Sequence, residues 1–259
     1  MRYLVISDIH ANLQALDAVM DNARAARFDH VLCLGDLVGY GADPEAVVGK
    51  ILALAPLTVI RGNHDKVAAG IEPALDFHDQ ARQAIEWTTK ALSPGSLERL
   101  RALTQGPTEV APDLFICHGA PFDEDHYIFD ARDASRAIAS GLATTTSGGP
   151  GRLTLFGHTH VPAAFAAARR GIEVLLPDLS PDLADVQVLD WDRDRPMLVN
   201  VGAVGQPRDG DPRAAYGIVD TDTNLIEFRR VEYDIKTAQE RILAAGLPER
   251  LASRLDRGA

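Results

Sequence analysis

Cysteine is scarce in this sequence, and the two that occur, Cys33 and Cys117, each stand inside a short apolar run typical of a strand. A reduced, buried thiol is expected there in preference to a disulfide. The chain also lacks an apolar run long enough to span a membrane. The run after Met1 is broken by Asp8 and His10, which makes it too short and too polar for a signal peptide. These absences predict a cytoplasmic protein that does not act in a membrane.

Positively charged residues are also few relative to acidic ones. The chain has 26 lysines and arginines and 37 acidic residues, so its formal net charge is −11. A surface of that sign repels polyanions at long range, so extended, non-specific binding of nucleic acid is not expected. Small or metal-neutralised substrates remain compatible with this charge. Hydrophobic residues, in contrast, make up 46% of the chain. A chain of this length and composition can bury a sizeable core.

The first third of the chain alternates short β-branched runs with amphipathic helical patterns, which indicates βαβ units and a parallel sheet. A longer helical pattern covers 73–92, where Pro94 and Gly95 are predicted to close it. This helix is expected to pack beside the sheet or to form a cap. The other elements predicted here are strands at 3–7, 31–34 and 57–60 and helices that begin near Asn12 and Pro44.

The second half of the chain begins with a fourth buried strand at 114–117 and a helix near 132–140. The threonine- and glycine-rich stretch 143–151 is predicted to be a flexible loop. Later strand-like runs are spaced as in a mostly antiparallel second sheet, and the tail 235–255 is predicted to be helical. The runs assigned to the second sheet are 153–156, 163–168, 173–176, 197–201, 216–220 and 225–231.

No internal repeat and no long linker interrupts the sequence. We therefore expect a single domain over residues 1–259, of the α/β class, in which two packed sheets are flanked by helices. A division near residue 150 is the alternative.

A metal ligand or an acid follows each of five predicted strands. In the pairs Asp8/His10 and His158/His160, the spacing puts both side chains on one side of an extended chain. Open α/β sheets bind ligands at the carboxyl ends of their strands, so the five ends can share one site. Burying so many polar groups without cations or hydrogen bonds would cost on the order of several kcal/mol. The five segments are Asp8-Ile9-His10, Gly35-Asp36, Gly62-Asn63-His64-Asp65, Cys117-His118-Gly119 and Gly157-His158-Thr159-His160.

In this order, the motifs resemble those of the calcineurin-like metallophosphoesterase superfamily, whose pattern is D-x-H, G-D, G-N-H-[DE], H-G and G-H-x-H. The match runs from Asp8 to His160, and the segment from Asn200 to Gly210 also looks like one common in bacterial and archaeal members. The resemblance implies a four-layer α/β/β/α sandwich of two packed β-sheets flanked by helices. It also implies one divalent metal ion held by Asp8, His10 and His160, a second held by Asn63, His118 and His158, and Asp36 bridging both.

The chemistry that the resemblance implies is hydrolysis of a phosphodiester or phosphomonoester in a small nucleotide-like molecule, by attack of metal-bound hydroxide. Two divalent ions roughly 3.5–4 Å apart can clamp an in-line phosphoryl displacement. Nitrogen and oxygen ligands together suit Mn, Fe, Zn or Co better than Ca or Mg. The resemblance also places His64 beside the metal pair as the general acid. Asp65 would either orient His64 or hold the turn.

One departure from the family pattern bears on the substrate. The serine/threonine protein phosphatases of the superfamily carry G-D-x-x-D-R-G, whereas this chain reads G-D-L-V-G-Y-G from Gly35. An orienting aspartate and a phosphate-binding arginine are therefore missing, which makes a protein phosphatase less expected than a phosphodiesterase or small-molecule phosphatase. Tyr40, His126 and Arg208 are the candidate substrate contacts.

Two other functions stay open. A nuclease is disfavoured, because neither a basic stripe nor an added nucleic-acid module is visible. A non-catalytic interaction scaffold of the same fold is expected to have lost metal ligands, yet every ligand position and His64 are filled here. The sequence therefore favours an enzyme acting on a small phosphoester.

Overall fold

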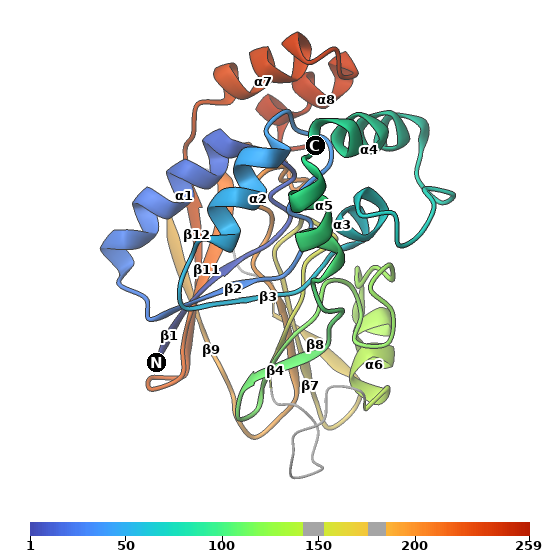
Figure 1. The fold of residues 1–259 in the computed structure, drawn as a ribbon. Coiled ribbons are helices and arrows are strands. Elements are labelled where there is room, and N and C mark those ends of the chain that lie inside the picture. The colour runs from blue at the N-terminus through green and yellow to red at the C-terminus, as the bar shows by residue number, and fades with distance from the viewer. Residues whose placement is uncertain (142–152, 176–184) are drawn as a thin grey trace.

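The computed structural model describes residues 1–141, 153–175 and 185–259 (Figure 1). Two six-stranded sheets pack face to face, and helices cover the outer face of each. This is the four-layer sandwich that the sequence predicted. The loop predicted at 143–151 lies outside the described residues. The helices are α1 Leu13–Ala26, α2 Pro44–Leu52, α3 Asn63–Ala68, α4 Asp79–Ala91, α5 Pro94–Arg101, α6 Ala131–Ala139, α7 Ile235–Ala244 and α8 Glu249–Ser253, followed by the 3-10 turn η1 Leu255–Arg257.

The first sheet contains, in spatial order, β3 Leu57–Val59, β2 His30–Cys33, β1 Arg2–Ile6, β11 Ala214–Asp220, β12 Leu225–Val231 and β9 Val186–Asp190. The strands β1, β2 and β3 are parallel, whereas β11 pairs antiparallel with β1. The sequence assignment of 216–220 and 225–231 to the second sheet was therefore wrong. A central strand such as β1 needs backbone partners on both edges, and β11 fills the second one.

The second sheet contains, in spatial order, β4 Thr108–Ala111, β5 Leu114–Ile116, β6 Leu153–Leu155, β10 Met197–Asn200, β7 Ala163–Ala167 and β8 Ile172–Val174. Strands β5, β6 and β10 are parallel to one another, whereas the pairings β4–β5, β10–β7 and β7–β8 are antiparallel. Two strands were not predicted from the sequence, β4 in this sheet and β9 in the first sheet. Both are edge strands with weakly apolar sequences, which explains why the pattern did not reveal them.

Alternating side chains along β1 pack into two separate hydrophobic cores. Leu4 and Ile6 pack against α1 and α2, whereas Tyr3 and Val5 pack between the two sheets. This alternation follows from the two-residue period of a strand. On the far side of the molecule, α6 covers the second sheet around Phe165. Because β1 is buried on both faces, the loop that follows it is held in place between the two sheets.

The helix predicted at 73–92 is shorter in the structure, where it covers only Asp79–Ala91. The helix α4 begins only after His78, whose Nδ1 accepts a hydrogen bond from the Ala81 backbone N–H at 3.3 Å. Pro94 ends α4 but also opens α5, with Ser93 as its N-cap. Proline lacks the N–H that a helix interior needs, yet its fixed φ suits a first turn. None of the described helices is long and apolar enough to cross a bilayer.

Gly205, in the loop after β10, shows how closely the loops at the site pack. Its N–H donates to the Asp8 carbonyl at 2.9 Å, and a Cβ at this position would overlap the Ile9 carbonyl oxygen. We expect Gly205→Ala to lower the free energy of unfolding by about 1–3 kcal/mol, as overpacking does. Urea unfolding would measure the change.

The matched control is Gly49→Ala in α2, where nothing lies within 4 Å of an added Cβ. This change should raise the free energy of unfolding by about 0.5–1 kcal/mol, because glycine is a poor residue for a helix interior. Equal stability of the Gly205→Ala variant and the parent protein would contradict the close packing described for this loop.

Candidate metal centre

Metal-ligand side chains from four loops gather at one edge of the sandwich, just beyond the carboxyl ends of β1, β2, β5 and β6. They form two groups, and within each group the ligand atoms lie within 4.8 Å of one another. All of these side chains are buried. The first ligand group is Asp8, His10, Asp36 and His160, and the second ligand group is Asp36, His118 and His158.

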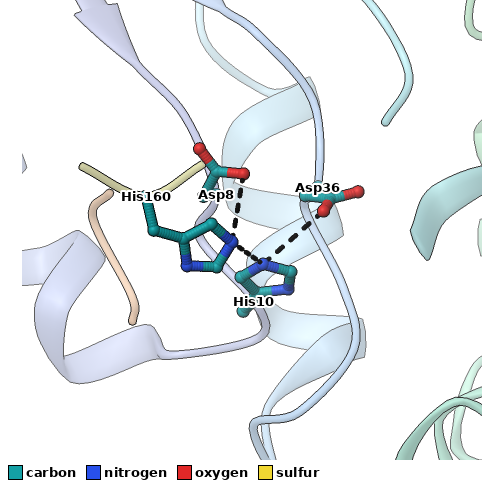
Figure 2. Close-up of side chains that lie close together, drawn as sticks. All are labelled: Asp8, His10, Asp36 and His160. Atoms are coloured by element: carbon teal, nitrogen blue, oxygen red, sulfur yellow. Dashed lines mark hydrogen bonds and ion pairs between the residues drawn. The ribbon is translucent and has the colours of Figure 1, made fainter. Parts of the chain in front are cut away.

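Asp36 belongs to both ligand groups. Its Oδ2 lies 3.5 Å from His10 Nε2 and 3.4 Å from His118 Nε2. Its other oxygen, Oδ1, accepts a hydrogen bond from the His64 backbone N–H at 2.8 Å. One carboxylate oxygen is therefore fixed by the backbone, while the other faces both groups. Figure 2 shows His10 facing Asp36 and His160 facing Asp8 within the first group.

The backbone at the centre is held in an unusual conformation. Five site residues adopt positive φ angles between 49° and 67°, in the left-handed region that side chains other than glycine rarely occupy. Each such residue is unfavourable by on the order of 1–3 kcal/mol, so the surrounding structure must hold it in place. Backbone hydrogen bonds between the loops do so, for example from the His10 N–H to the Asp36 carbonyl at 3.0 Å. The five residues are Asp8, His10, Asp36, His158 and His160.

The first ligand group suits a cation. Nδ1 of His10 lies 3.0 Å from the Val38 carbonyl, and Nδ1 of His160 lies 2.6 Å from the Gln206 carbonyl. A carbonyl oxygen only accepts, so both Nδ1 atoms must carry the proton. In the neutral rings the two Nε2 lone pairs then face each other at 3.0 Å, with Asp8 and Asp36 beside them. Such an arrangement of lone pairs and carboxylates is repulsive unless a positive charge lies among them.

The second ligand group uses both kinds of ring nitrogen. His118 donates from Nδ1 to the Leu34 carbonyl at 2.8 Å, which leaves Nε2 for a cation, 3.1 Å from Asn63 Oδ1. His158 instead donates from Nε2 to the Asp125 carbonyl at 3.0 Å, which leaves Nδ1 as its ligand atom. Hydrogen bonds to the second ring nitrogen are the usual way in which proteins orient histidine ligands.

The electrostatic environment keeps His10, His158 and His160 neutral, whereas His118 carries a proton beside the ionised Asp36. Burial lowers the pKa of His158 to about 3 and holds those of His10 and His160 well below the usual range. Burial opposes ionisation of Asp36, but His118 and His64 hold the pKa of its carboxyl well below its usual value. Burial also disfavours charged His118, yet Asp36 outweighs this and raises the His118 pKa to about 10. A metal ion bound there would replace that proton.

His64 stands beside the ligand groups but belongs to neither of them. Its ring lies 4.5 Å from the Tyr40 and Phe77 rings and 4.8 Å from the His10 ring, measured between centroids. It also lines a cleft that opens beside the two ligand groups. Burial lowers its pKa to about 4. The ring is therefore neutral near pH 7 in the absence of substrate.

Asp65 contacts backbone groups rather than the His64 ring. Its Oδ1 accepts from the N–H groups of Leu37 at 2.9 Å and Val38 at 3.2 Å, and its Oδ2 accepts from Gly62 at 3.0 Å. These bonds tie the loop after β2 to the start of α3. Of the two roles predicted for Asp65, the contacts favour that of holding the turn.

A cleft of about 160 Å³ opens beside Asn63, His64 and His158. Tyr40 lines it, together with Tyr127, whose ring stacks on His158 with 3.9 Å between centroids. His126 is not among the described residues that line this cleft, because its ring lies against Phe122 instead, at 5.0 Å. The sequence analysis selected the histidine for its chemistry and missed its neighbour. Side chains of successive residues in an extended loop point to opposite sides, and only the structure fixes which side faces the cleft.

Arg208 follows β10 and lies near the first ligand group. Its backbone N–H donates to the His160 carbonyl at 3.3 Å, and its guanidinium carbon is 5.8 Å from the centre of the Tyr40 ring. The guanidinium also donates to Gln206 Oε1 at 3.0 Å. Two of the three predicted substrate contacts, Tyr40 and Arg208, therefore lie together. The role of Gln206 as the partner of His160 was not visible in the sequence, because its backbone oxygen makes the contact.

A family model described as the calcineurin-like phosphoesterase superfamily domain matches residues 1–224, a span that contains every residue of both ligand groups. The chain belongs to this superfamily. The resemblance seen in the sequence motifs is thereby confirmed. Calcineurin-like phosphoesterases are generally hydrolases that bind divalent metals, and the two ligand groups of this member suit such ions.

Relatives extend the likeness beyond the matched domain. An uncharacterised protein of Methanocaldococcus jannaschii is 36% identical over 253 residues, which cover 97% of this chain and 96% of the relative. The crystal structure of a metallophosphoesterase from Sphaerobacter thermophilus is 38% identical, with a TM-score of 0.81 over 100% of this chain and 99% of that one. A hypothetical protein from Pyrococcus horikoshii, 22% identical, shares the fold with a TM-score of 0.78 over 100% of this chain and 98% of its own. The calcineurin-like fold therefore covers the whole chain.

Proposed function

We propose that this calcineurin-like phosphoesterase, working as one domain over residues 1–259, hydrolyses a phosphodiester or phosphomonoester in a small nucleotide-like molecule with two divalent metal ions. The position of Asp36 in both ligand groups supports a pair of ions, because one carboxylate between two cations offsets their repulsion. The mixed ligand set suits Mn, Fe, Zn or Co. The first ion would be held by Asp8, His10 and His160, and the second by Asn63, His118 and His158, with Asp36 shared.

When bound, the metal pair would supply Lewis acidity and a water of lowered pKa. The residues of the chain would then orient the ester and move protons. His64 lines the cleft and is proposed to protonate the leaving oxygen. Burial holds its pKa at about 4, but an anionic ester beside the ring would raise that pKa and favour the protonated form. Asp65 would act by holding the turn that carries His64.

Cys33 and Cys117 are both buried and unbridged, which supports the cytoplasmic location that we propose. Disulfides are rare in the cytoplasm, where reduced, buried thiols are usual. We therefore place the proposed activity in the cytoplasm, on substrates that are themselves small and dissolved.

The test of the proposed function is metal-dependent turnover. Purified protein would be assayed with bis-p-nitrophenyl phosphate and p-nitrophenyl phosphate, in Mn²⁺ and after treatment with a chelator. We expect the chelator to lower the rate at least about tenfold and added Mn²⁺ to restore it, because catalysis depends on the ions. Single-stranded DNA serves as the comparison substrate for a nuclease. The absence of metal-dependent turnover on either ester would instead favour a non-catalytic scaffold.

Arg208 provides a prediction about substrate binding. We expect Arg208→Ala to raise KM for bis-p-nitrophenyl phosphate about tenfold, since a hydrogen bond to a charged group typically contributes about 1.5–3 kcal/mol. Steady-state kinetics would measure KM, and elemental analysis would show an unchanged metal content, because Arg208 is in neither ligand group. Unchanged kinetics would remove Arg208 from the substrate site.

A further inference from the structure

Half-buried arginines of this protein are commonly paired with acidic side chains. Arg61 lies 3.0 Å from Glu124, and Arg213 lies 2.7 Å from Asp211. Arg208 and Arg254 differ, because no aspartate or glutamate of the described residues lies within ion-pair distance of either. Unpaired charge that is partly removed from water is unfavourable, so a fold retains it where a ligand of opposite sign binds.

The two guanidinium groups meet at one neutral acceptor. Arg208 Nη2 donates to Gln206 Oε1 at 3.0 Å, and Arg254 Nη1 donates to the same oxygen at 2.9 Å. Nε of Arg208 is buried and has no partner among the described residues, whereas Nε of Arg254 donates to the main-chain oxygen of Ala259, the last residue of the sequence. Burial, with Arg208 nearby, lowers the pKa of Arg254 to about 10. Two cations thus share a single amide oxygen.

This arginine pair, Arg208 and Arg254, adjoins the candidate metal centre. The segment that carries Arg208 is bound to the metal-ligand candidate His160 on both sides. His160 Nδ1 donates to the Gln206 carbonyl at 2.6 Å, and the Arg208 N–H donates to the His160 carbonyl at 3.3 Å. The Arg208 guanidinium also faces Tyr40, whose ring is tilted against the His10 ring with 4.7 Å between centroids. An anion bound by the pair would therefore lie beside the ester at the metal centre.

We propose that Arg208 and Arg254 form a second anion site, in which Arg208 contacts both the phosphoester that is cleaved and a further phosphate group of the substrate, and Arg254 binds that further group. This role in turnover rests on the proposed function, and it narrows the substrate to phosphoesters with two or more phosphate groups. Guanidinium groups match phosphate oxygens through pairs of N–H donors. Arg254 follows α8 and lies outside residues 1–224, so the family match does not include this half of the site.

Anion binding can be tested without metal or turnover. Inorganic phosphate would be titrated calorimetrically into the chelator-treated protein at low salt, for the parent chain, Arg254→Gln and Arg257→Gln. Arg257, which follows Arg254 in the same C-terminal segment, is the matched control, because its side chain is 74% exposed and is paired with the neighbouring Asp256. We expect Arg254→Gln to weaken phosphate binding at least about fivefold, and the control to stay within about twofold.

Two results would overturn the second anion site: parent protein that binds no phosphate without metal, or an Arg254→Gln variant that binds it as tightly as the parent. Thermal unfolding of each variant shows that it is folded. Arg254→Lys keeps the positive charge but loses the planar set of N–H donors of the guanidinium group. It should bind phosphate with an affinity between those of the parent protein and Arg254→Gln.

A second experiment tests whether the anion site contributes to turnover. With Mn²⁺ bound, phosphate release from adenosine 3′,5′-bisphosphate and from AMP, both phosphoesters, would be compared, and Arg254→Gln should lower the ratio of kcat/KM for the bisphosphate to that for AMP about tenfold. An unchanged ratio would show that the arginine pair does not recognise the additional phosphate. If no ester is hydrolysed at all, the proposed function fails, while the phosphate titration still decides whether the anion site exists.

Discussion

Replacing Asp36 with asparagine should lower kcat/KM for bis-p-nitrophenyl phosphate by more than about 100-fold. This decrease is larger than the one usually seen when a residue that only supports a metal ligand is replaced. Asparagine has the same shape and can keep the hydrogen bond from the His64 N–H. It removes the negative charge that lies between His10 and His118. We expect steady-state kinetics to show the loss and elemental analysis to show fewer than two metal ions per chain.

Asp220→Asn is the matched control for this experiment. Asp220 is a buried carboxyl group of the same sheet, paired with Arg2 at 2.9 Å. It ends β11, which runs antiparallel to β1, and therefore lies at the opposite edge from the metal centre. This variant should lose some stability but keep its metal ions and its activity. If Asp36→Asn retained the activity and metal content of the control, the shared-carboxylate arrangement would be refuted.

Replacing His64 with alanine should lower kcat by about 100-fold or more, the usual contribution of a general acid, while leaving the metal content unchanged. The ring is in neither ligand group, and the hydrogen bond to Asp36 comes from the backbone N–H, which any residue supplies. The loss should be larger for an alkyl ester than for a p-nitrophenyl ester, since an alkoxide needs the proton more. Kinetics on both esters would measure the difference.

His30→Ala is the control, because His30 is also partly buried but bonds to Thr58 at 2.9 Å within the first sheet. It should leave kcat on both esters near the parent value. Equal losses on alkyl and aryl esters in His64→Ala would argue that His64 shapes the cleft and does not donate a proton.

The side chains that gather in the two ligand groups were all candidates from the sequence, because each lies in a short segment directly after a strand. Local patterns carry that information, and the topology of an α/β sheet brings strand ends together. The pairing of β11 with β1 could not be predicted in the same way, since the partners are more than 200 residues apart. Nothing local to 216–220 distinguishes the edge of one sheet from the edge of the other.

The surroundings of the metal centre were less predictable than the ligands. Tyr127 and Gln206 act through ring stacking and a backbone carbonyl, which leave no characteristic residue pattern. Arg254 is one of several arginines in a helical tail, and its sequence neighbours do not mark it out. Such residues are identified only when the folded chain shows which groups lack a partner.

The left-handed backbone at the metal centre has a consequence for engineering. Glycine would relieve torsional strain at each of the five ligand positions with positive φ. A search for thermostable variants that ignored activity would therefore tend to replace the metal ligands. Stability and catalysis are then opposing selection pressures at the same residues. A thermostabilised form of this protein is better sought in helix interiors such as that around Gly49, far from the loops that carry the ligands.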